Sequence, residues 1–435
     1  MSDRRYHSVI LDYDACKGCT ICVTGCPAEA IRVRDGKAQI IAERCIDCGE
    51  CIRRCPHRAK KAQCDDFSLF HSDSNLLQIA LPAPSLYGQF PDQYSIADIH
   101  AALIELGFDA VFPVAAVTDS IARAGCAFLD RAMHPDIPRP LISSSCPTIV
   151  NLVQIRFPSL LDHILPVLAP MELAGRVAKQ LLDGIAGKPI KAWFISPCPG
   201  KITEAIAPLG GEKTSVDGVF SMHDVYLPLL QALKKGNSGY TGILPAAASE
   251  IAWGRSGGEA EATFPGGKDS YLAIDGMDQC IKILEAVEDG QLTDIDYLEL
   301  MACPLGCVGG AITAINPSIA AHTLKRRERL FTKTVDLPPE CVCEQDACLR
   351  SAEFPPRPAL LLDKDFHRAM SMMEQMEEIH KALPGLDCGC CGSPNCHALA
   401  EDIVRGMAKK TDCVIILKEQ YRELLDSKQK DGHEG

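Results

Sequence analysis

Cysteine is the residue type that governs the chemistry open to this sequence. The chain has 435 residues and 23 cysteines, and two runs near its N-terminus read ACKGCTICVTGCP and RCIDCGECIRRCP. Each run has the spacing C-x2-C-x2-C-x3-C-P, in which three thiolates of one loop hold a 4Fe-4S cluster and the fourth cysteine ligates the other cluster. The spacing therefore predicts one cluster on Cys16, Cys19, Cys22 and Cys55 and a second on Cys45, Cys48, Cys51 and Cys26.

Zinc binding by each run is the alternative to iron-sulfur clusters. Zinc sites usually place two C-x-x-C pairs a dozen or more residues apart, which is not the spacing found here. Apolar stretches on both sides of Asp35, Gly36 and Lys37 predict a β-hairpin between the runs. The doubled, proline-terminated run resembles the bacterial-type ferredoxins. This resemblance implies an N-terminal α+β ferredoxin domain with two 4Fe-4S clusters over residues 1–62.

A second group of cysteines follows strand-like apolar segments in the middle of the chain. PLISSSCP ends with Cys146 and its proline, KAWFISPCPGK contains Cys198, and YLELMACPLGCVGG contains Cys303 and Cys307. Ligands of open α/β sheets bind beyond the carboxyl ends of the strands, so we expect these four thiols to meet at one site. Burial as ordinary core cysteines is the alternative. It does not explain why three of the four precede a proline.

The segments around these cysteines predict an α/β domain. Between residues 75 and 335, strand-like runs such as LLQIAL and KAWFIS alternate with helix-like stretches such as PMELAGRVAKQLLDGIAG. This alternation is typical of helices layered on a sheet. Gly306, Gly309 and Gly310 allow the backbone beside Cys307 to pack closely against a bulky group.

These segments resemble those of a known family. SSSCP, SPCPGK and ELMACPLGCVGG match, in order and spacing, the three signature motifs of the FeFe hydrogenases. The resemblance implies an α/β catalytic domain of two lobes around an H-cluster over residues 75–335, with reversible oxidation of H2 and reduction of protons. In that family the H-cluster is a 4Fe-4S cube joined to a two-iron unit with CO, CN and dithiolate ligands. The resemblance assigns the cube to Cys146, Cys198, Cys303 and Cys307, with Cys307 as the bridge to the two-iron unit.

The resemblance also assigns residues around the two-iron unit. Lys201 matches the lysine that hydrogen-bonds a cyanide, and Met301 matches the methionine that packs on the two-iron unit. An ammonium is a suitable partner for an anionic ligand in a dry site because it offsets the cost of removing that charge from water. Maturation proteins that supply the two-iron unit are partners implied by the same resemblance.

Residues of the proton path depart from the family pattern. Ser145 stands where fast members carry a proton-transferring cysteine, and Ser196 stands where they carry a methionine. A hydroxyl is a far weaker acid than a thiol, whose ordinary pKa is about 8.5. Glu204 is a carboxylate in a matching place, although an exposed helix charge is an equal interpretation of it. Other positions of the path align with Arg123, Cys126 and Leu165.

An intact metal site with an altered proton supply resembles the sensory group of FeFe hydrogenases. We therefore expect slow turnover and a sensory or regulatory role, with H2 and protons as substrates and a redox partner such as ferredoxin or a signalling protein. The alternatives are a non-catalytic Nar1-like iron-sulfur protein and an electron-transfer subunit that carries only 4Fe-4S clusters. Lys201 and Met301 favour the hydrogenase, because both belong to a two-iron site.

The composition of the chain changes after residue 335. Residues 336–365 are rich in proline and cysteine and predict a linker with Cys341, Cys343 and Cys348 as loop thiols. Residues 366–435 contain DCGCCGSPNC and resemble the small iron-sulfur domain of Rnf-type and corrinoid proteins, with zinc as the alternative. The amphipathic tail predicts a docking helix or a homodimer. The resemblance implies a small helical domain with one 4Fe-4S cluster on Cys388, Cys391, Cys396 and Cys413, and leaves Cys390 as an extra thiol.

Charge and apolar runs argue against other classes of protein. The formal net charge is −13, which argues against nucleic acid binding through a positive field. No apolar run approaches the roughly 18 residues of a membrane span, and the start MSDRRYHSVILDYDAC has no signal-peptide core. We therefore expect no membrane association and a cytoplasmic location.

Overall fold

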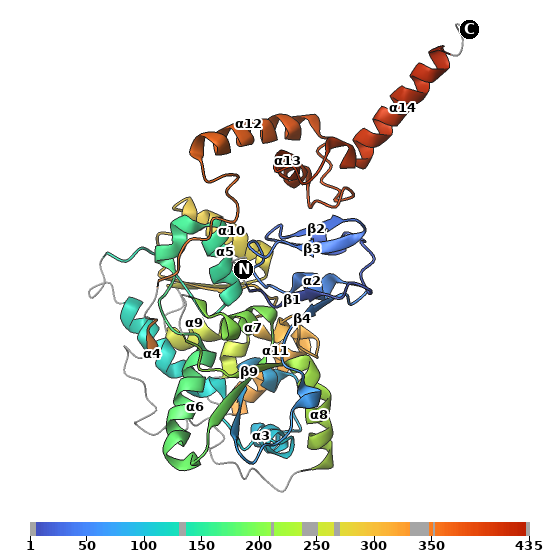
Figure 1. Cartoon of the computed structure of the whole chain (residues 1–435). Coiled ribbons are helices and arrows are strands. Elements are labelled where there is room, and N and C mark those ends of the chain that lie inside the picture. Colours follow the sequence, from blue (N-terminus) through green and yellow to red (C-terminus); the bar gives the residue numbers. More distant parts are fainter. Residues whose placement is uncertain are drawn as a thin grey trace.

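The computed structural model describes residues 6–129, 136–209, 213–236, 251–264, 270–330, 348–350 and 353–431. Figure 1 shows an α/β domain, a small N-terminal unit beside it, and a helical C-terminal unit that lies next to the β2–β3 hairpin of the N-terminal unit. This architecture confirms the predicted fold class.

The N-terminal unit is an α+β fold with two antiparallel strand pairs, β1–β4 and β2–β3. Between β2 and β3, Asp35 (φ 51°) and Gly36 (φ 72°) both have positive φ, as a two-residue type I′ turn requires. The predicted hairpin is therefore confirmed. The elements of this unit are β1 (Val9–Leu11), α1 (Ile21–Thr24), β2 (Ile31–Arg34), β3 (Lys37–Ile40), α2 (Glu50–Arg54) and β4 (Lys60–Ala62).

The α/β domain contains two parallel sheets, one for each lobe, with strand orders β6-β5-β8-β9 and β10-β11-β7. All residues of β5 and β11 are buried. Parallel strands that are covered on both faces read as continuous apolar runs, which explains LQIALP in the sequence. The strands are β5 (Leu77–Pro82), β6 (Ala110–Val111), β7 (Leu141–Ile142), β8 (Ile190–Ser196), β9 (Gly218–Ser221), β10 (Tyr271–Asp275) and β11 (Tyr297–Met301).

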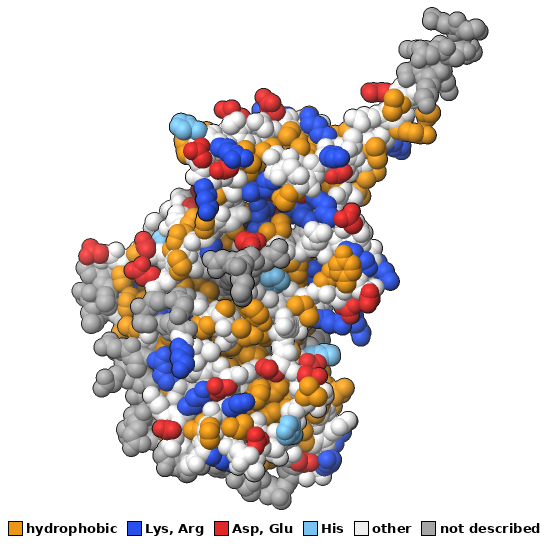
Figure 2. All heavy atoms as spheres, in the orientation of Figure 1, with side chains coloured by type: hydrophobic (Ala, Val, Ile, Leu, Met, Phe, Trp, Pro, Cys, Tyr) orange, Lys and Arg blue, Asp and Glu red, His pale blue; other side chains and the backbone are white. Residues whose placement is uncertain are grey.

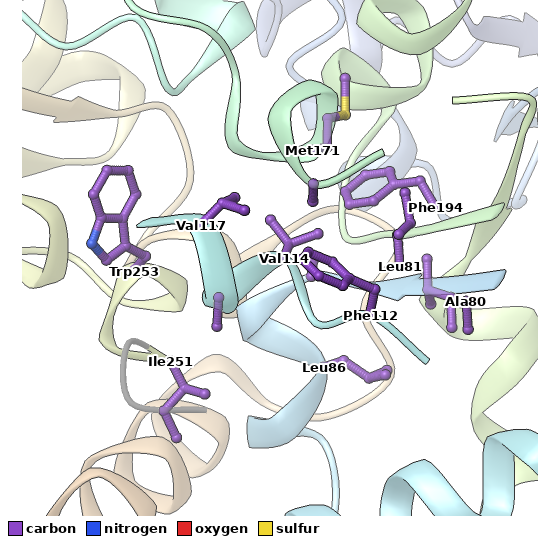
Figure 3. Packing of buried hydrophobic residues seen from close by; sticks show 14 of the residues in the cluster. Ala80, Leu81, Leu86, Phe112, Val114, Val117, Met171, Phe194, Ile251 and Trp253 are labelled. Carbon is purple, nitrogen blue, oxygen red and sulfur yellow. The ribbon is translucent and has the colours of Figure 1, made fainter. Parts of the chain in front are cut away.

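Helices cover these sheets and bury two hydrophobic cores, one at each sheet. In the first core, Leu81 of β5 and Phe194 of β8 pack with Met171 of α6 and with Val114 (Figure 3). The helices are α3 (Ile96–Glu105), α4 (Thr118–Leu129), α5 (Pro147–Arg156), α6 (Pro170–Ala186), α7 (Pro199–Ile206), α8 (Met222–Lys235), α9 (Gly258–Thr263), α10 (Met277–Glu288) and α11 (Pro317–Leu330).

The C-terminal unit consists of α12 (Phe366–Ala382), α13 (Cys396–Val404) and α14 (Val414–Asp431). Its small core contains Met376 and Leu399 together with cysteines of the predicted cluster. The last helix, α14, extends away from the rest of the molecule (Figure 1) and carries hydrophobic side chains on its surface (Figure 2).

The C-terminal unit is attached to the N-terminal unit by buried ion pairs. Asp402 of α13, whose side chain is 1% exposed, accepts hydrogen bonds from Arg32 Nε at 2.6 Å and Arg34 Nη2 at 2.7 Å. Glu401 pairs with Arg44 through two contacts, one of them 3.0 Å long. Figure 2 shows Lys and Arg side chains gathered where the two units meet.

Part of the predicted linker is packed against the α/β domain. Cys348 is fully buried in the first core, and the backbone N–H of Leu168 donates to its carbonyl oxygen at 2.8 Å. Cys348 is thus a core residue of the α/β domain, and its interpretation as a thiol that binds no metal stays a prediction. Cys341 and Cys343 lie outside the described residues.

None of the helices within the described ranges combines the length and the apolar character needed to cross a bilayer.

Candidate functional site

Four cysteines from distant parts of the chain line one cavity of the α/β domain. Cys146 follows β7, Cys198 follows β8, and Cys303 and Cys307 follow β11. The cavity has an empty volume of about 850 Å³, part of it open to solvent, against the ~30 Å³ that one water molecule occupies in the liquid. The structure thus brings together the four thiols predicted from the strand ends. Their role as cluster ligands stays a prediction.

Cys-Pro steps fix the positions of two of these thiols. Cys146 and Cys198 are the N-cap residues of α5 and α7, and Pro147 and Pro199 begin the helices. Proline suits the first helical position because its φ matches the helix and its missing N–H would have no intrahelical partner there. Each step therefore starts a helix at a strand end and leaves the thiol at the end of the sheet.

The loop that carries Cys303 and Cys307 is tightly packed. Leu305 (φ 61°) and Gly306 (φ 88°) both have left-handed backbone conformations. A Cβ atom on Gly306 would lie 2.8 Å from Sδ of Met301. This position therefore requires glycine, and Met301 lines the same cavity as the thiols.

Burial is the largest influence on the pKa values of Cys198, Cys303 and Cys307, and it favours their protonated form. It raises the pKa of Cys303 to about 11 and that of Cys307 to about 12. Burial also raises the pKa of Cys198 well above its ordinary value, and the charges of Cys303 and Cys307 add to this effect. A metal centre reverses the balance, because coordination deprotonates a thiol outright. Four thiols in a cavity with mostly apolar walls therefore fit an iron-sulfur cluster, which cysteine thiolates hold.

Lys201 places a buried cation in the cavity wall. Its Nζ donates to the backbone oxygen of Ser145 at 2.9 Å. Burial lowers the pKa of Lys201, but the charge of Glu204 opposes burial, as do Cys307 and Cys198 in their thiolate form, and the net pKa lies above the ordinary value. An ammonium has three N–H donors. Lys201 therefore stays charged and retains donors for an anionic group beside the thiols.

Glu259 of α9 is a residue of the cavity that the sequence interpretation missed. Its Oε1 accepts hydrogen bonds from Ser143 Oγ at 2.8 Å, Ser145 Oγ at 2.9 Å and Tyr297 Oη at 2.8 Å. Its Oε2 has no hydrogen-bond partner among the described residues. Burial raises the pKa of Glu259, although these three donors oppose the effect. The serines therefore surround a carboxylate, which lines the cavity beside the cysteines.

Glu299 of β11 is a second buried carboxylate behind Glu259. It accepts hydrogen bonds from the backbone N–H groups of Gly257 and Ala260, both at 2.8 Å. Burial, followed by the charge of Glu259, raises the pKa of Glu299 to about 8. Arg255, which lowers this pKa, has a side chain only 10% exposed and pairs with Glu328. Glu259 and Glu299 are therefore two buried carboxylates whose charges influence each other.

Other residues predicted for the site lie outside the cavity wall. Glu204 is buried and pairs with Arg350, at 2.9 Å, so its interpretation as an exposed helix charge is wrong. The hydroxyl of Ser196 accepts from the N–H of Cys198 and donates to the carbonyl of Cys198, which closes the turn before α7. Arg123 is exposed and pairs with Asp119 on its own helix.

Two further cavities lie in the N-terminal unit. As predicted, each is lined by the first three cysteines of one run and the fourth cysteine of the other run. The two sets are Cys26, Cys45, Cys48 and Cys51 in one cavity and Cys16, Cys19, Cys22 and Cys55 in the other. Cys48 also lines the central cavity of the α/β domain. The cavity lined by Cys26, Cys45, Cys48 and Cys51 therefore adjoins the four-thiol site.

The cysteines of the C-terminal unit are partly gathered. Cys391, Cys396 and Cys413 belong to its small core, and Cys388 and Cys390 are exposed. A hydrogen bond with Cys388 and the charge of that thiol raise the pKa of Cys390. The choice of Cys391 over Cys390 as a ligand stays a prediction.

Comparisons with protein families agree with this arrangement. The family described as iron-only hydrogenase large subunit, C-terminal domain, matches residues 77–234 and 248–311. A 4Fe-4S dicluster domain matches residues 8–56, and an Fe-S cluster family matches residues 383–415.

Individual proteins show the same relationship. The NADP-reducing hydrogenase subunit HndD of Solidesulfovibrio fructosivorans is 24% identical over 406 residues, which cover 76% of this chain and 68% of HndD. The periplasmic Fe hydrogenase large subunit of Nitratidesulfovibrio vulgaris is 24% identical over 393 residues, covering 75% of this chain and 91% of that protein. The solved structure of a variant of FeFe-hydrogenase HydA1 from Chlamydomonas reinhardtii covers 67% of this chain and 98% of its own, with 17% identity and a TM-score of 0.50.

Proposed function

Because this chain belongs to the family of the iron-only hydrogenase large subunit, C-terminal domain, we propose that it catalyses the reversible conversion of H2 to two protons and two electrons. The observation that carries the proposal is the meeting of four thiols with the buried ammonium of Lys201 in one cavity. Cys146, Cys198, Cys303 and Cys307 would hold the cube of an H-cluster, with Cys307 as the bridge to the two-iron unit. When bound, this group supplies the iron centre at which H2 is split or formed.

Lys201 and Met301 serve the outer side of that group. Lys201 keeps its charge because Glu204 offsets the effect of burial on its pKa, and its ammonium would donate to an anionic cyanide of the bound group. Met301 fills the wall without offering a proton, since a thioether has no acidic hydrogen. These two side chains favour the hydrogenase over a Nar1-like protein or an electron-transfer subunit, neither of which needs a two-iron site.

The proton route begins at Ser145 and Glu259. The hydroxyl of Ser145 donates to Glu259 at 2.9 Å and relays protons by rotation, since it is too weak an acid to release them itself. Burial raises the pKa of Glu259 above its ordinary value, and a carboxyl that holds its proton more readily suits a proton carrier. Glu299, with a pKa of about 8, is the next carrier toward the surface. A hydroxyl in place of a thiol makes turnover slow, as a sensory or regulatory role requires.

Electrons travel through the N-terminal clusters. Cys48 lines both the central cavity and the nearer cluster cavity, so the two sites share a wall residue. A one-electron carrier such as ferredoxin, or a signalling protein, exchanges electrons with the clusters. Maturation proteins supply the two-iron unit, and the cytoplasm is the proposed location.

Infrared spectroscopy of the maturated protein tests the function. CO and CN stretching bands that change under H2 are expected in the wild type and in Cys126→Ala, whose exposed thiol lies outside the cavity. Cys307→Ala is expected to lose the bands. If the maturated wild type shows none while its 4Fe-4S clusters are detected by electron paramagnetic resonance, the chain is an iron-sulfur protein of the alternative kind.

A further inference from the structure

The segment before the C-terminal unit is fastened to the α/β domain by its backbone. The N–H of Leu168 donates to the carbonyl of Cys348, and the N–H of Arg350 donates to the carbonyl of Pro166, each at 2.8 Å. Between them, Leu349 forms an antiparallel bridge with Val167. Residues 348–350 are therefore paired in one register with residues 166–168, and this pairing fixes where the side chain of Arg350 lies in the α/β domain.

The guanidinium of Arg350 is buried and makes three hydrogen bonds. It donates to the carbonyls of Val167 and Leu209, both at 3.0 Å, and to Oε1 of Glu204 at 2.9 Å. The side chains of Arg350 and Glu204 are 2% and 1% exposed. The guanidinium carbon also lies 5.1 Å from the ring centre of Phe354, within the range of a cation–π contact. This ion pair is thus shielded from water on all sides.

Glu204 stands one helical turn from Lys201 on α7, on the same face of the helix. Its Oε2 has no hydrogen-bond partner among the described residues, although it is buried. A buried carboxylate that loses its cation must find another, because an unpaired charge in the interior is costly. The neighbouring cation on α7 is Lys201, whose ammonium now donates to Ser145.

We propose that Arg350 is a positioning residue for Lys201. By forming an ion pair with Glu204, Arg350 prevents this carboxylate from pairing with the ammonium of Lys201, which must point at the four-thiol cavity. This role differs from that of a general stabilising ion pair. If Glu204 is removed together with Arg350, the carboxylate that would bind Lys201 is gone, and we expect Lys201 to keep its position. The inference rests on the proposed function only where it concerns the two-iron unit.

Residues 355–359 make contacts that connect the region after Arg350 to the C-terminal unit. Arg357 donates through Nη1 to Asn151 of α5 at 3.1 Å, and Gln154 of α5 donates to the carbonyl of Pro355 at 2.9 Å. Two residues later, the carbonyl of Ala359 accepts from Arg44, the arginine that pairs with Glu401. A displacement of the C-terminal unit would therefore pull on the segment that positions Arg350.

Crystal structures of the cluster-loaded protein test the proposal without requiring the two-iron unit. In Arg350→Met, Nζ of Lys201 is expected to leave the carbonyl of Ser145 and bind Glu204. In the double variant Arg350→Met/Glu204→Gln, it is expected to return to Ser145. Arg156→Met is the matched control, because it removes an exposed ion pair with Glu285. Lys201 held at Ser145 in Arg350→Met would overturn the proposal.

Infrared and kinetic readouts extend the test to maturated protein. Arg350→Met is expected to shift the CN bands and to lower H2 oxidation at least tenfold, and the double variant is expected to recover wild-type band positions. Arg350→Met removes the partner of a buried charge, so its folding is checked by thermal denaturation, and the double variant provides the comparison without that charge. Equal band shifts in the single and double variants would refute the mechanism. Absence of bands in the wild type would refute the proposed function and leave the crystallographic result to decide on Arg350.

Discussion

Glu299→Gln should change how the stability of the protein depends on pH. The carboxyl of Glu299 has a pKa of about 8 in the folded chain, against an ordinary value of 4.5, because burial and the charge of Glu259 disfavour its ionised form. Between these two values the folded state holds a proton that the unfolded state releases. The free energy of unfolding therefore falls as pH rises through this window.

The size of the effect follows from the shift. One pKa unit corresponds to about 1.4 kcal/mol, and at pH 8 half of the folded molecules have already released this proton. Glu299 therefore lowers the free energy of unfolding by about 2 kcal/mol between pH 6 and pH 8. About 2–4 °C of Tm per kcal/mol is typical for domains of 150–250 residues, so the loss corresponds to roughly 4–8 °C. Glutamine carries no charge and removes this dependence, and its oxygen can still accept from one of the two backbone N–H groups.

Anaerobic calorimetry of the cluster-loaded protein at a single scan rate measures the effect. The Tm of the wild type should fall between pH 6 and pH 8 by several degrees more than the Tm of Glu299→Gln. Glu261→Gln, at an exposed residue of α9, should follow the wild type. In a Glu259→Gln background the effect should shrink, because the charge of Glu259 is part of its cause. Parallel Tm curves for wild type and Glu299→Gln would refute this account of the buried carboxylate pair.

Three further substitutions probe the site and the attachment of the units. Glu259→Gln should slow H2 oxidation about 10²–10⁴-fold through loss of a proton carrier, with unchanged CO and CN bands; an unchanged rate would mean that protons leave by another route. Ser145→Ala should also slow turnover but cost only about 1 kcal/mol in urea unfolding, because two other donors still reach Glu259. Asp402→Ala should destabilise the contact between N-terminal and C-terminal units by about 3 kcal/mol, because it leaves Arg32 buried and unpaired. Limited proteolysis at α12 should then accelerate, and unchanged cleavage would contradict the role of this ion pair.

Local patterns account for the parts of the structure that the sequence predicted. The spacing of the cysteine runs is a property of one loop each, and the structure groups their thiols as that spacing requires. The Cys-Pro steps at Cys146 and Cys198 likewise encode both the strand end and the helix start in adjacent residues. Such signals need no knowledge of the tertiary fold.

The partners of the carboxylates Glu259 and Glu204 come from remote segments of the chain. Glu259 lies 114 residues from Ser145 in the chain, and its local sequence GGEAEAT has no motif that sets it apart from an exposed helix start. Glu204 has the same appearance, because its cation comes from Arg350, 146 residues away. A carboxylate whose partner is supplied by packing cannot be told from a solvated one by local pattern. Ser143 and Ser145, two of the three serines before Cys146, were the available hint, since buried hydroxyls need an acceptor.

The ion pairs between α13 and the N-terminal unit have a consequence for shortened forms of the protein. A chain cut before residue 366 would expose Arg32, Arg34 and Arg44 without their carboxylate partners. The full chain has a net charge of −13, and the shortened chain would stay acidic, so these arginines would form a cationic face suited to self-association with acidic surfaces of other copies. A well-behaved truncation would therefore have to replace the three arginines with neutral residues.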